Sequence, residues 1–243
     1  MSRIPPEEMG PASAQMITDP AFDALARDRK SVRGFKADPV PRELVRKILE
    51  IARTAPSGAN LQPGRFVVLS GRALRRFSDT LSAAIEDGLK PVEAYSYFPE
   101  PMPKTLRERQ VKTGAGLYAA LGIDRKDPAA RRRQFMRNYR FFDAPVGMVA
   151  TIDDRMGKGC FMDFGMMLQT LLLAAQAEGL ATCGIGALAS YGPFIAQQLN
   201  LDTHEMVVCG VALGYEDPDA PANTHQTDRM PVDQFARFEG WSE

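Results

Sequence analysis

Histidine is scarce in this sequence of 243 residues. The chain has only His204 and His225, and neither lies at a metal-ligand spacing or beside a candidate serine or cysteine nucleophile. The patterns G-x-S-x-G, H-E-x-x-H and the P-loop are also missing. The sequence therefore offers little of its own for hydrolytic chemistry and predicts no metal site. We expect a bound cofactor to supply any difficult chemistry.

An excess of charge of either sign is also missing. Thirty Lys and Arg residues balance thirty Asp and Glu residues, so the chain lacks the broad electropositive surface that is typical of nucleic-acid-binding proteins. The first eight residues contain no apolar core of a signal peptide. Their prolines and acids predict that residues 1–18 form an N-terminal arm that is either mobile or clasping.

Cysteine is nearly as rare as histidine. Cys160, Cys183 and Cys209 form no C-x-x-C pair and stand in apolar surroundings, which favour buried thiols over a disulfide or a zinc site. Free thiols are typical of a reducing compartment, and we expect the protein to be cytoplasmic.

Hydrophobic periodicity, in contrast, is plentiful and predicts most of the secondary structure. The predicted elements are helices over 19–29, 41–54, 72–89 and 161–178, and strands over 65–70, 146–152 and 206–213. The helix over 161–178 is apolar on nearly every side but short for a bilayer, so we expect it in a core or at a subunit interface. Strands separated by helices indicate an α/β or α+β sheet.

Composition changes over about residues 90–140, which are rich in aromatics, prolines and charge. Such an excursion commonly shapes a substrate pocket, and packing of Tyr97 and Phe98 against a helix is an equally good interpretation. A basic helix over 129–140 is more typical of a solvated face than of a ligand site. We treat residues 19–243 as one domain that contains this excursion.

Three cations and a hydroxyl gather within five residues, at Arg29, Lys30, Ser31 and Arg33. Arginine can donate two N–H groups to one phosphate, while lysine adds a point charge and serine a short hydrogen bond. The cluster therefore suits a terminal phosphate. A solvated basic turn, or a docking site for an anionic partner, remains the alternative at this point.

Three segments, in their order and spacing, resemble the FMN-dependent nitroreductase family. They are R-x-S-x-R-x-F at 29–35, A-P-S-G-A-N-L-Q-P at 55–63 and G-L-A-T-C-G-I-G at 179–186. The resemblance covers about residues 19–235 and is loose only between 90 and 138. It implies an α+β fold of three layers, α-β-α, in which helices flank a central, mostly antiparallel sheet, and it implies an intertwined homodimer.

The resemblance also implies a cofactor site for FMN. Residues 29–33 would hold the phosphate and ribityl chain, the loop at 56–60 would come from the second subunit and lie along the flavin ring, and the turn at 184–186 would approach flavin N5 and O4. Arg229, in a T-D-R-M-P motif, would be a second phosphate ligand. The implied cofactor-binding residues are Arg29, Lys30, Ser31, Arg33, Pro56, Ser57, Gly58, Asn60, Gln62, Cys183, Gly184, Ile185, Gly186 and Arg229.

The activity implied by the resemblance is reduction of nitroaromatic compounds to hydroxylamines, with NADPH or NADH as donor, by ping-pong hydride transfer. Flavin N5 carries the chemistry, so no catalytic side chain is expected. We expect Tyr95, Tyr97 and Phe98 to stack on a small aromatic substrate and Arg107 to meet an anionic substituent. No nucleic acid or membrane is expected as a partner.

Two questions stay open at the level of sequence. Relatives on this scaffold also reduce quinones, enones or halogenated aromatics, and a non-catalytic FMN-binding redox sensor would carry the same motifs. The family usually has tryptophan after Gln-Pro, whereas this chain has Gly64. The sequence does not indicate which group fills that space.

Overall fold

Four antiparallel strands form the centre of the molecule in the computed structural model, which describes residues 20–92 and 94–241. Their order is β1-β2-β4-β3, and every neighbouring pair is antiparallel. The strands are β1 Gly64–Ser70, β2 Val146–Asp153, β3 Ala181–Ile185 and β4 Glu205–Gly214. The three strands expected from the sequence are confirmed, as is the mostly antiparallel sheet.

The strand β3 differs from the prediction, which had a turn at Gly184–Gly186. Gly184 and Ile185 are the last residues of β3, and Gly186 begins the 3-10 helix η3, Gly186–Tyr191. The strand has only five residues and includes a threonine and a glycine, so its sequence lacks the apolar run by which the other strands were recognised.

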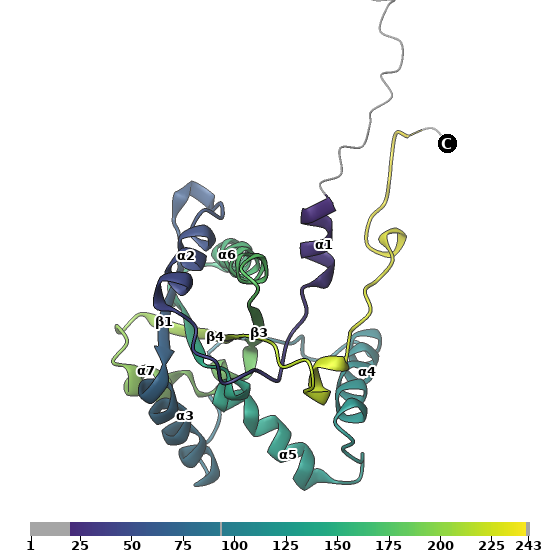
Figure 1. Ribbon diagram of the computed structural model, residues 1–243. Coiled ribbons are helices and arrows are strands. Elements are labelled where there is room, and N and C mark those ends of the chain that lie inside the picture. The colour runs from purple at the N-terminus through teal and green to yellow at the C-terminus, as the bar shows by residue number, and fades with distance from the viewer. Residues whose placement is uncertain (1–19, 93, 242–243) are drawn as a thin grey trace, which may run out of the picture.

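One face of the sheet is covered by α2, Arg42–Ala52, and α6, Lys158–Ala177 (Figure 1). Ile48 of α2 and Leu171 of α6 are fully buried in one cluster with Met148 of β2. Of the helices that the structure describes, α6 alone has the length and hydropathy of a membrane span. Its inner side packs in this layer, and the rest of the helix is accessible, since only 22% of the apolar span is buried.

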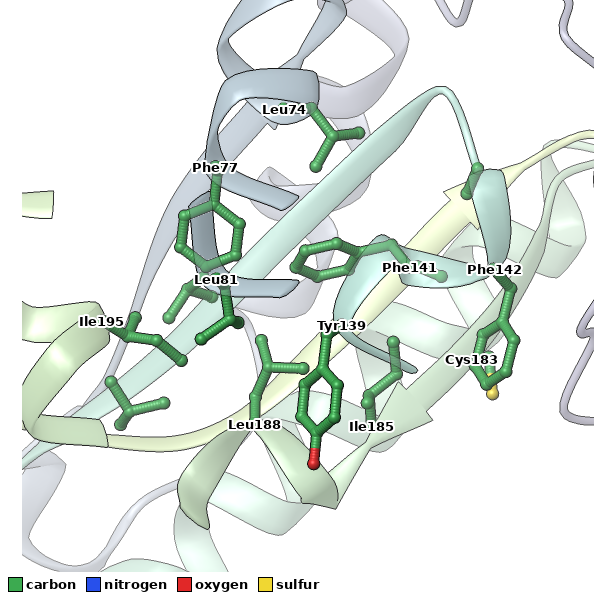
Figure 2. Packing of buried hydrophobic residues seen from close by; sticks show 14 of the residues in the cluster. Leu74, Phe77, Leu81, Tyr139, Phe141, Phe142, Cys183, Ile185, Leu188 and Ile195 are labelled. Atoms are coloured by element: carbon green, nitrogen blue, oxygen red, sulfur yellow. The ribbon is translucent and has the colours of Figure 1, made fainter. Parts of the chain in front are cut away.

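The opposite face is covered by α3, Gly71–Glu86, by α7, Gly192–Leu199, and by the 3-10 segment η2, Arg137–Asp143. Figure 2 shows Phe77 of α3, Phe141 of η2 and Ile195 of α7 converging on this face. The sequence analysis did not predict α7. With helices on both faces, the expected three-layer α-β-α arrangement is confirmed.

The excursion contains two helices, α4, Lys104–Ala120, and α5, Pro128–Met136. The basic helix expected over 129–140 is confirmed in part, because regular α-helix ends at Met136 and η2 follows. The helix α4 was not predicted. None of its side chains is buried, so it lacks the apolar stripe that reveals a helix in sequence.

Both ends of the described chain leave the layers (Figure 1). The first helix, α1, spans Pro20–Asp28, close to the predicted 19–29; its expected first residue and the predicted N-terminal arm lie outside the described residues. After β4 the chain forms the short 3-10 helices η4, Pro221–Thr224, and η5, Val232–Gln234. Beyond them Phe238 and Trp241 are largely exposed.

Candidate functional site

The basic segment at 29–33 runs along the edge of the sheet beside β3. Ser31 forms a parallel bridge with Thr182, and the N–H of Val32 donates to the Thr182 carbonyl at 2.9 Å. The Val32 side chain is buried. Because side chains alternate along an extended segment, those of Ser31 and Arg33 are directed away from the core.

A buried asparagine holds this segment in place. Asn223 of η4 accepts a hydrogen bond from the N–H of Arg33 at 2.7 Å and donates to the carbonyls of Gly34 at 2.8 Å and Asp217 at 2.9 Å. Its side chain is 3% exposed. Sequence reasoning missed this residue, since no motif surrounds it and an asparagine near a proline is ordinary loop composition.

Five of the residues expected to bind cofactor line one pocket of about 110 Å³. They are Arg29, Lys30, Ser31, Arg33 and Arg229. The structure thus brings together a segment near the start of the chain and a residue near its end. Four cations around a small cavity favour an anionic ligand, because each guanidinium or ammonium group adds a favourable charge interaction.

The cations of the pocket differ in how far they are already engaged. Lys30 Nζ lies 2.8 Å from Glu216 Oε1 and donates to the Asn223 carbonyl. Arg33 and Arg229 donate to Ser31 O at 3.1 Å and Thr227 Oγ1 at 2.7 Å. Within the described residues, the Arg29 guanidinium has neither an ion-pair nor a hydrogen-bond partner. It is therefore the cation most available to a ligand.

At the other end of β3, Tyr97 packs on the backbone of Gly186. A Cβ atom at position 186 would lie 2.9 Å from Tyr97 Cε2, so only glycine permits this contact. Tyr97 also meets Phe98 in an edge-on contact, with ring centroids 4.8 Å apart. Both rings, together with Arg107, line a second pocket of about 530 Å³.

Tyr95 contacts Tyr97, with ring centroids 6.3 Å apart, but it does not line this pocket. Its hydroxyl donates to the Val208 carbonyl at 2.6 Å, and its ring centroid lies 5.7 Å from that of Phe161. Burial raises the pKa of the Tyr95 phenol. This residue packs against the core and does not line the pocket that holds Tyr97 and Phe98.

Cys183 also points inward, into the cluster beside Phe142 (Figure 2). Burial raises the pKa of its thiol, so the group stays neutral and unreactive. Any contact of Cys183 with a cofactor is therefore through the backbone. All three cysteines of the chain are free.

The loop at 56–62 lies apart from the basic pocket. Pro56, Ser57 and Gln62 line a separate pocket of about 180 Å³ beside Asp163 of α6, and the N–H of Gly58 donates to Asp163 at 3.1 Å. Ala59, Asn60 and Gln62 have positive φ angles of 50°, 57° and 49°. Such strain in non-glycine residues is typical of binding loops. One chain alone does not bring this loop to the basic pocket.

The space beside Gly64 is filled from α6. A Cβ atom at position 64 would lie 2.3 Å from Cδ2 of Phe164 and 3.1 Å from the sulfur of Met167. The Phe164 ring thus occupies the volume in which the resemblance leads one to expect a tryptophan. The glycine permits the close approach of α6 to β1.

Comparisons with known proteins agree with this arrangement. The family model described as the nitroreductase family matches residues 26–215. The chain belongs to the nitroreductase family. Among the family's curated members, it is 40% identical to the chloronitrobenzene nitroreductase of Comamonas testosteroni, covering 92% of this chain and 99% of that protein. It is 36% identical to a 4-nitrobenzoate reductase of Nocardioides sp. strain LMS-CY, covering 98% of each.

Solved structures of nitroreductases superpose closely on this fold. The FMN and NADPH-dependent nitroreductase NfnB of Sphigopyxis sp. strain HMH matches with a TM-score of 0.87 and 37% identity, over 91% of this chain and 99% of that one. The FMN-dependent nitroreductase NfnB of Mycobacterium smegmatis, solved in complex with NADPH, matches with a TM-score of 0.86 and 30% identity, over 90% and 98%.

Proposed function

We propose that the protein is an FMN-dependent oxidoreductase that uses NADPH or NADH to reduce small nitroaromatic compounds to hydroxylamines. The observation that carries this proposal is the pocket in which Arg29, Ser31, Arg33 and Arg229 meet at the edge of β3. Its charge and size suit a phosphate group. The relatives named for chloronitrobenzene and 4-nitrobenzoate support the substrate class.

In this proposal Arg29, Lys30, Arg33 and Arg229 hold the FMN phosphate, with Ser31 as a hydroxyl donor. FMN, when bound, accepts hydride at N5 from the nicotinamide and passes the reducing equivalents to the nitro group. The backbone from Gly184 to Gly186 would border the flavin, and the open space beside Gly184, which has no side chain, would allow close approach. Tyr97 and Phe98 then offer aromatic faces to a planar substrate.

Arg107 is the residue that we assign to anionic substituents. It lines the same pocket as Tyr97 and Phe98, and a guanidinium can form two parallel hydrogen bonds with a carboxylate. A nitrobenzoate would therefore be held better than nitrobenzene. Tyr95 keeps only a packing role in this scheme.

We further propose that the working unit is a homodimer in the cytoplasm. The loop at 56–62 does not reach the basic pocket of its own chain, so a second copy would supply it. Met162 on the outer side of α6 is 71% exposed, and Trp241 near the chain end is 78% exposed. Met166, one helical turn further along α6, is also exposed, and neighbouring exposed apolar side chains are typical of subunit contacts. The three free cysteines suit a reducing compartment.

A spectrum of the purified protein tests the proposal. We expect flavin absorbance, its loss when NADPH is added without oxygen, and its return when a nitroaromatic compound follows. Repeating the reduction with NADH gives the donor preference. A yellow protein that turns over no acceptor, including quinones, enones and halogenated aromatics, would indicate a redox sensor. A colourless protein that ignores added FMN would overturn the proposal.

A further inference from the structure

His225 lies in close contact with α4. A Cβ atom at Gly116 would be 2.4 Å from Cε1 of the imidazole and 2.8 Å from Nδ1. Such distances are shorter than any side chain tolerates. The glycine is therefore required for the histidine to sit against this helix. The ring is one of several contacts between the excursion and the C-terminal part of the chain, which also include the ion pair of Lys112 with Asp228.

The position of the ring is also fixed from its own segment. His225 directly follows η4, and Asn223 of η4 is hydrogen-bonded to the backbone of Arg33, Gly34 and Asp217. The segment that carries His225 is thereby tied to the segment that carries the basic cluster. The imidazole is held between two elements and is not a freely moving surface group.

One nitrogen of this ring is buried without a partner. Nε2 of His225 is inaccessible to solvent and makes no hydrogen bond with any described residue. Leaving a buried polar nitrogen unpaired costs about 1–3 kcal/mol, so such atoms in native proteins call for an explanation. The other ring nitrogen, Nδ1, is not among these buried atoms and has no hydrogen-bond partner among the described residues, so it is the nitrogen that a ligand can reach.

The same ring lines the small pocket that contains Arg29, Ser31, Arg33 and Arg229. Every charged side chain that lines this pocket is a cation. An imidazole N–H is a hydrogen-bond donor. Because the cations around it favour negative charge, the acceptor that best suits this donor is a negatively charged oxygen. An anion in the pocket would satisfy both the cations and the accessible nitrogen Nδ1 of this ring.

We propose that His225 is a further ligand of the FMN phosphate and that Gly116 holds it in place. The ring then links the occupant of the pocket to α4, the helix whose residues Arg107 and Gln110 line the pocket of Tyr97 and Phe98. This inference rests on the proposed function, because it takes FMN as the cofactor. The residue carries no part of the electron transfer.

Binding of two flavins that differ only in the phosphate tests the proposal. Dissociation constants for FMN and riboflavin are measured by flavin fluorescence with the full-length protein, after bound flavin is removed. We expect His225→Phe, which keeps a ring and loses both nitrogens, to weaken FMN binding about tenfold or more. Riboflavin binding is expected to change less than twofold. Equal weakening of both flavins, or of neither, would overturn the inference.

A double-mutant cycle tests the role of Gly116. We expect Gly116→Ala to weaken FMN binding in the wild-type background and to have no further effect in His225→Ala, where the added methyl group has room. Additive effects would overturn the role of Gly116, and circular dichroism shows whether each variant is folded. If the wild-type protein binds neither flavin, the proposed function itself fails, which is distinct from a failure confined to the variants.

Discussion

Arg29 is the residue on which the phosphate pocket depends most. Its guanidinium has no protein partner within the described residues, whereas Lys30, Arg33 and Arg229 each donate to a neighbour. An unengaged cation exchanges only water for the ligand when it binds. Loss of the Arg29 side chain should therefore lower the affinity for FMN more than the free energy of unfolding.

We expect Arg29→Ala to raise the dissociation constant for FMN about tenfold or more, since a hydrogen bond to a charged group contributes about 1.5–3 kcal/mol. Arg27→Ala is the matched control, because Arg27 is an exposed cation two residues away that pairs with Asp23. Equilibrium dialysis measures both. Full flavin retention in Arg29→Ala would instead support the alternative that the basic cluster is a solvated turn with no role in binding.

Gly64 is a residue at which any added side chain introduces steric strain. Gly64→Ala should lower the free energy of unfolding by about 1–3 kcal/mol, because the new methyl group would overlap the Phe164 ring. Gly114→Ala provides the comparison, since nothing lies within 4 Å of its added Cβ atom and alanine favours a helix interior. Urea denaturation at one protein concentration measures both. Equal stability of the two variants would contradict this packing.

The sequence predicted the charged residues of the site, but it did not predict the residues that position them. Arg29, Arg33 and Arg229 belong to short motifs whose chemistry is visible in their letters. Asn223, His225 and Phe164 do not, because their roles depend on which distant segments lie beside them. Contacts such as that between Gly116 and His225 are set by tertiary packing and have no local signature.

At the scale of elements, η4 works as a clamp on the basic segment. Asn223→Ala would leave the N–H of Arg33 without a partner and would remove one of the two hydrogen bonds that the carbonyls of Gly34 and Asp217 each accept. We therefore expect a loss of about 2–4 kcal/mol in the free energy of unfolding. Weaker FMN binding is expected at temperatures where the variant is folded. Thermal denaturation followed by circular dichroism measures the first effect.

Asn138→Ala is the control for this clamp. Asn138 makes one local hydrogen bond, from Nδ2 to the Phe135 carbonyl at 2.7 Å, so its loss should cost less than about 1 kcal/mol. If both asparagine variants are equally stable, the clamp does not exist as described.

The elements that sequence predicted are those with a strong apolar pattern. The helices α2 and α3 bury one stripe each, so their helical period is clear, and β2 is buried along nearly its whole length and reads as a continuous apolar run. The helix α4 has no buried face, and β3 is short with polar and small residues. Both depend on neighbours that sequence alone does not place.

At the scale of the whole molecule, the outer side of α6 is the surface that a second copy should cover. We expect the double variant Met162→Lys and Met166→Lys to be monomeric and to lose FMN, because two charges would have to be buried in an apolar contact. Light scattering and flavin content measure these effects. The double leucine variant at the same positions keeps the apolar surface and should remain dimeric. A lysine variant that stays dimeric would place the contact elsewhere.

At Gly64 and Phe164, which are distant in sequence, the substitutions allowed at one position depend on the residue at the other. Neither can change freely, since a larger residue at 64 has no room while Phe164 is present, and a smaller residue at 164 leaves a void while Gly64 is present. Substitutions at the two positions should therefore be inherited together. A relative with tryptophan after its Gln-Pro is expected to carry a small side chain opposite, and the two solutions should not be interchangeable one residue at a time.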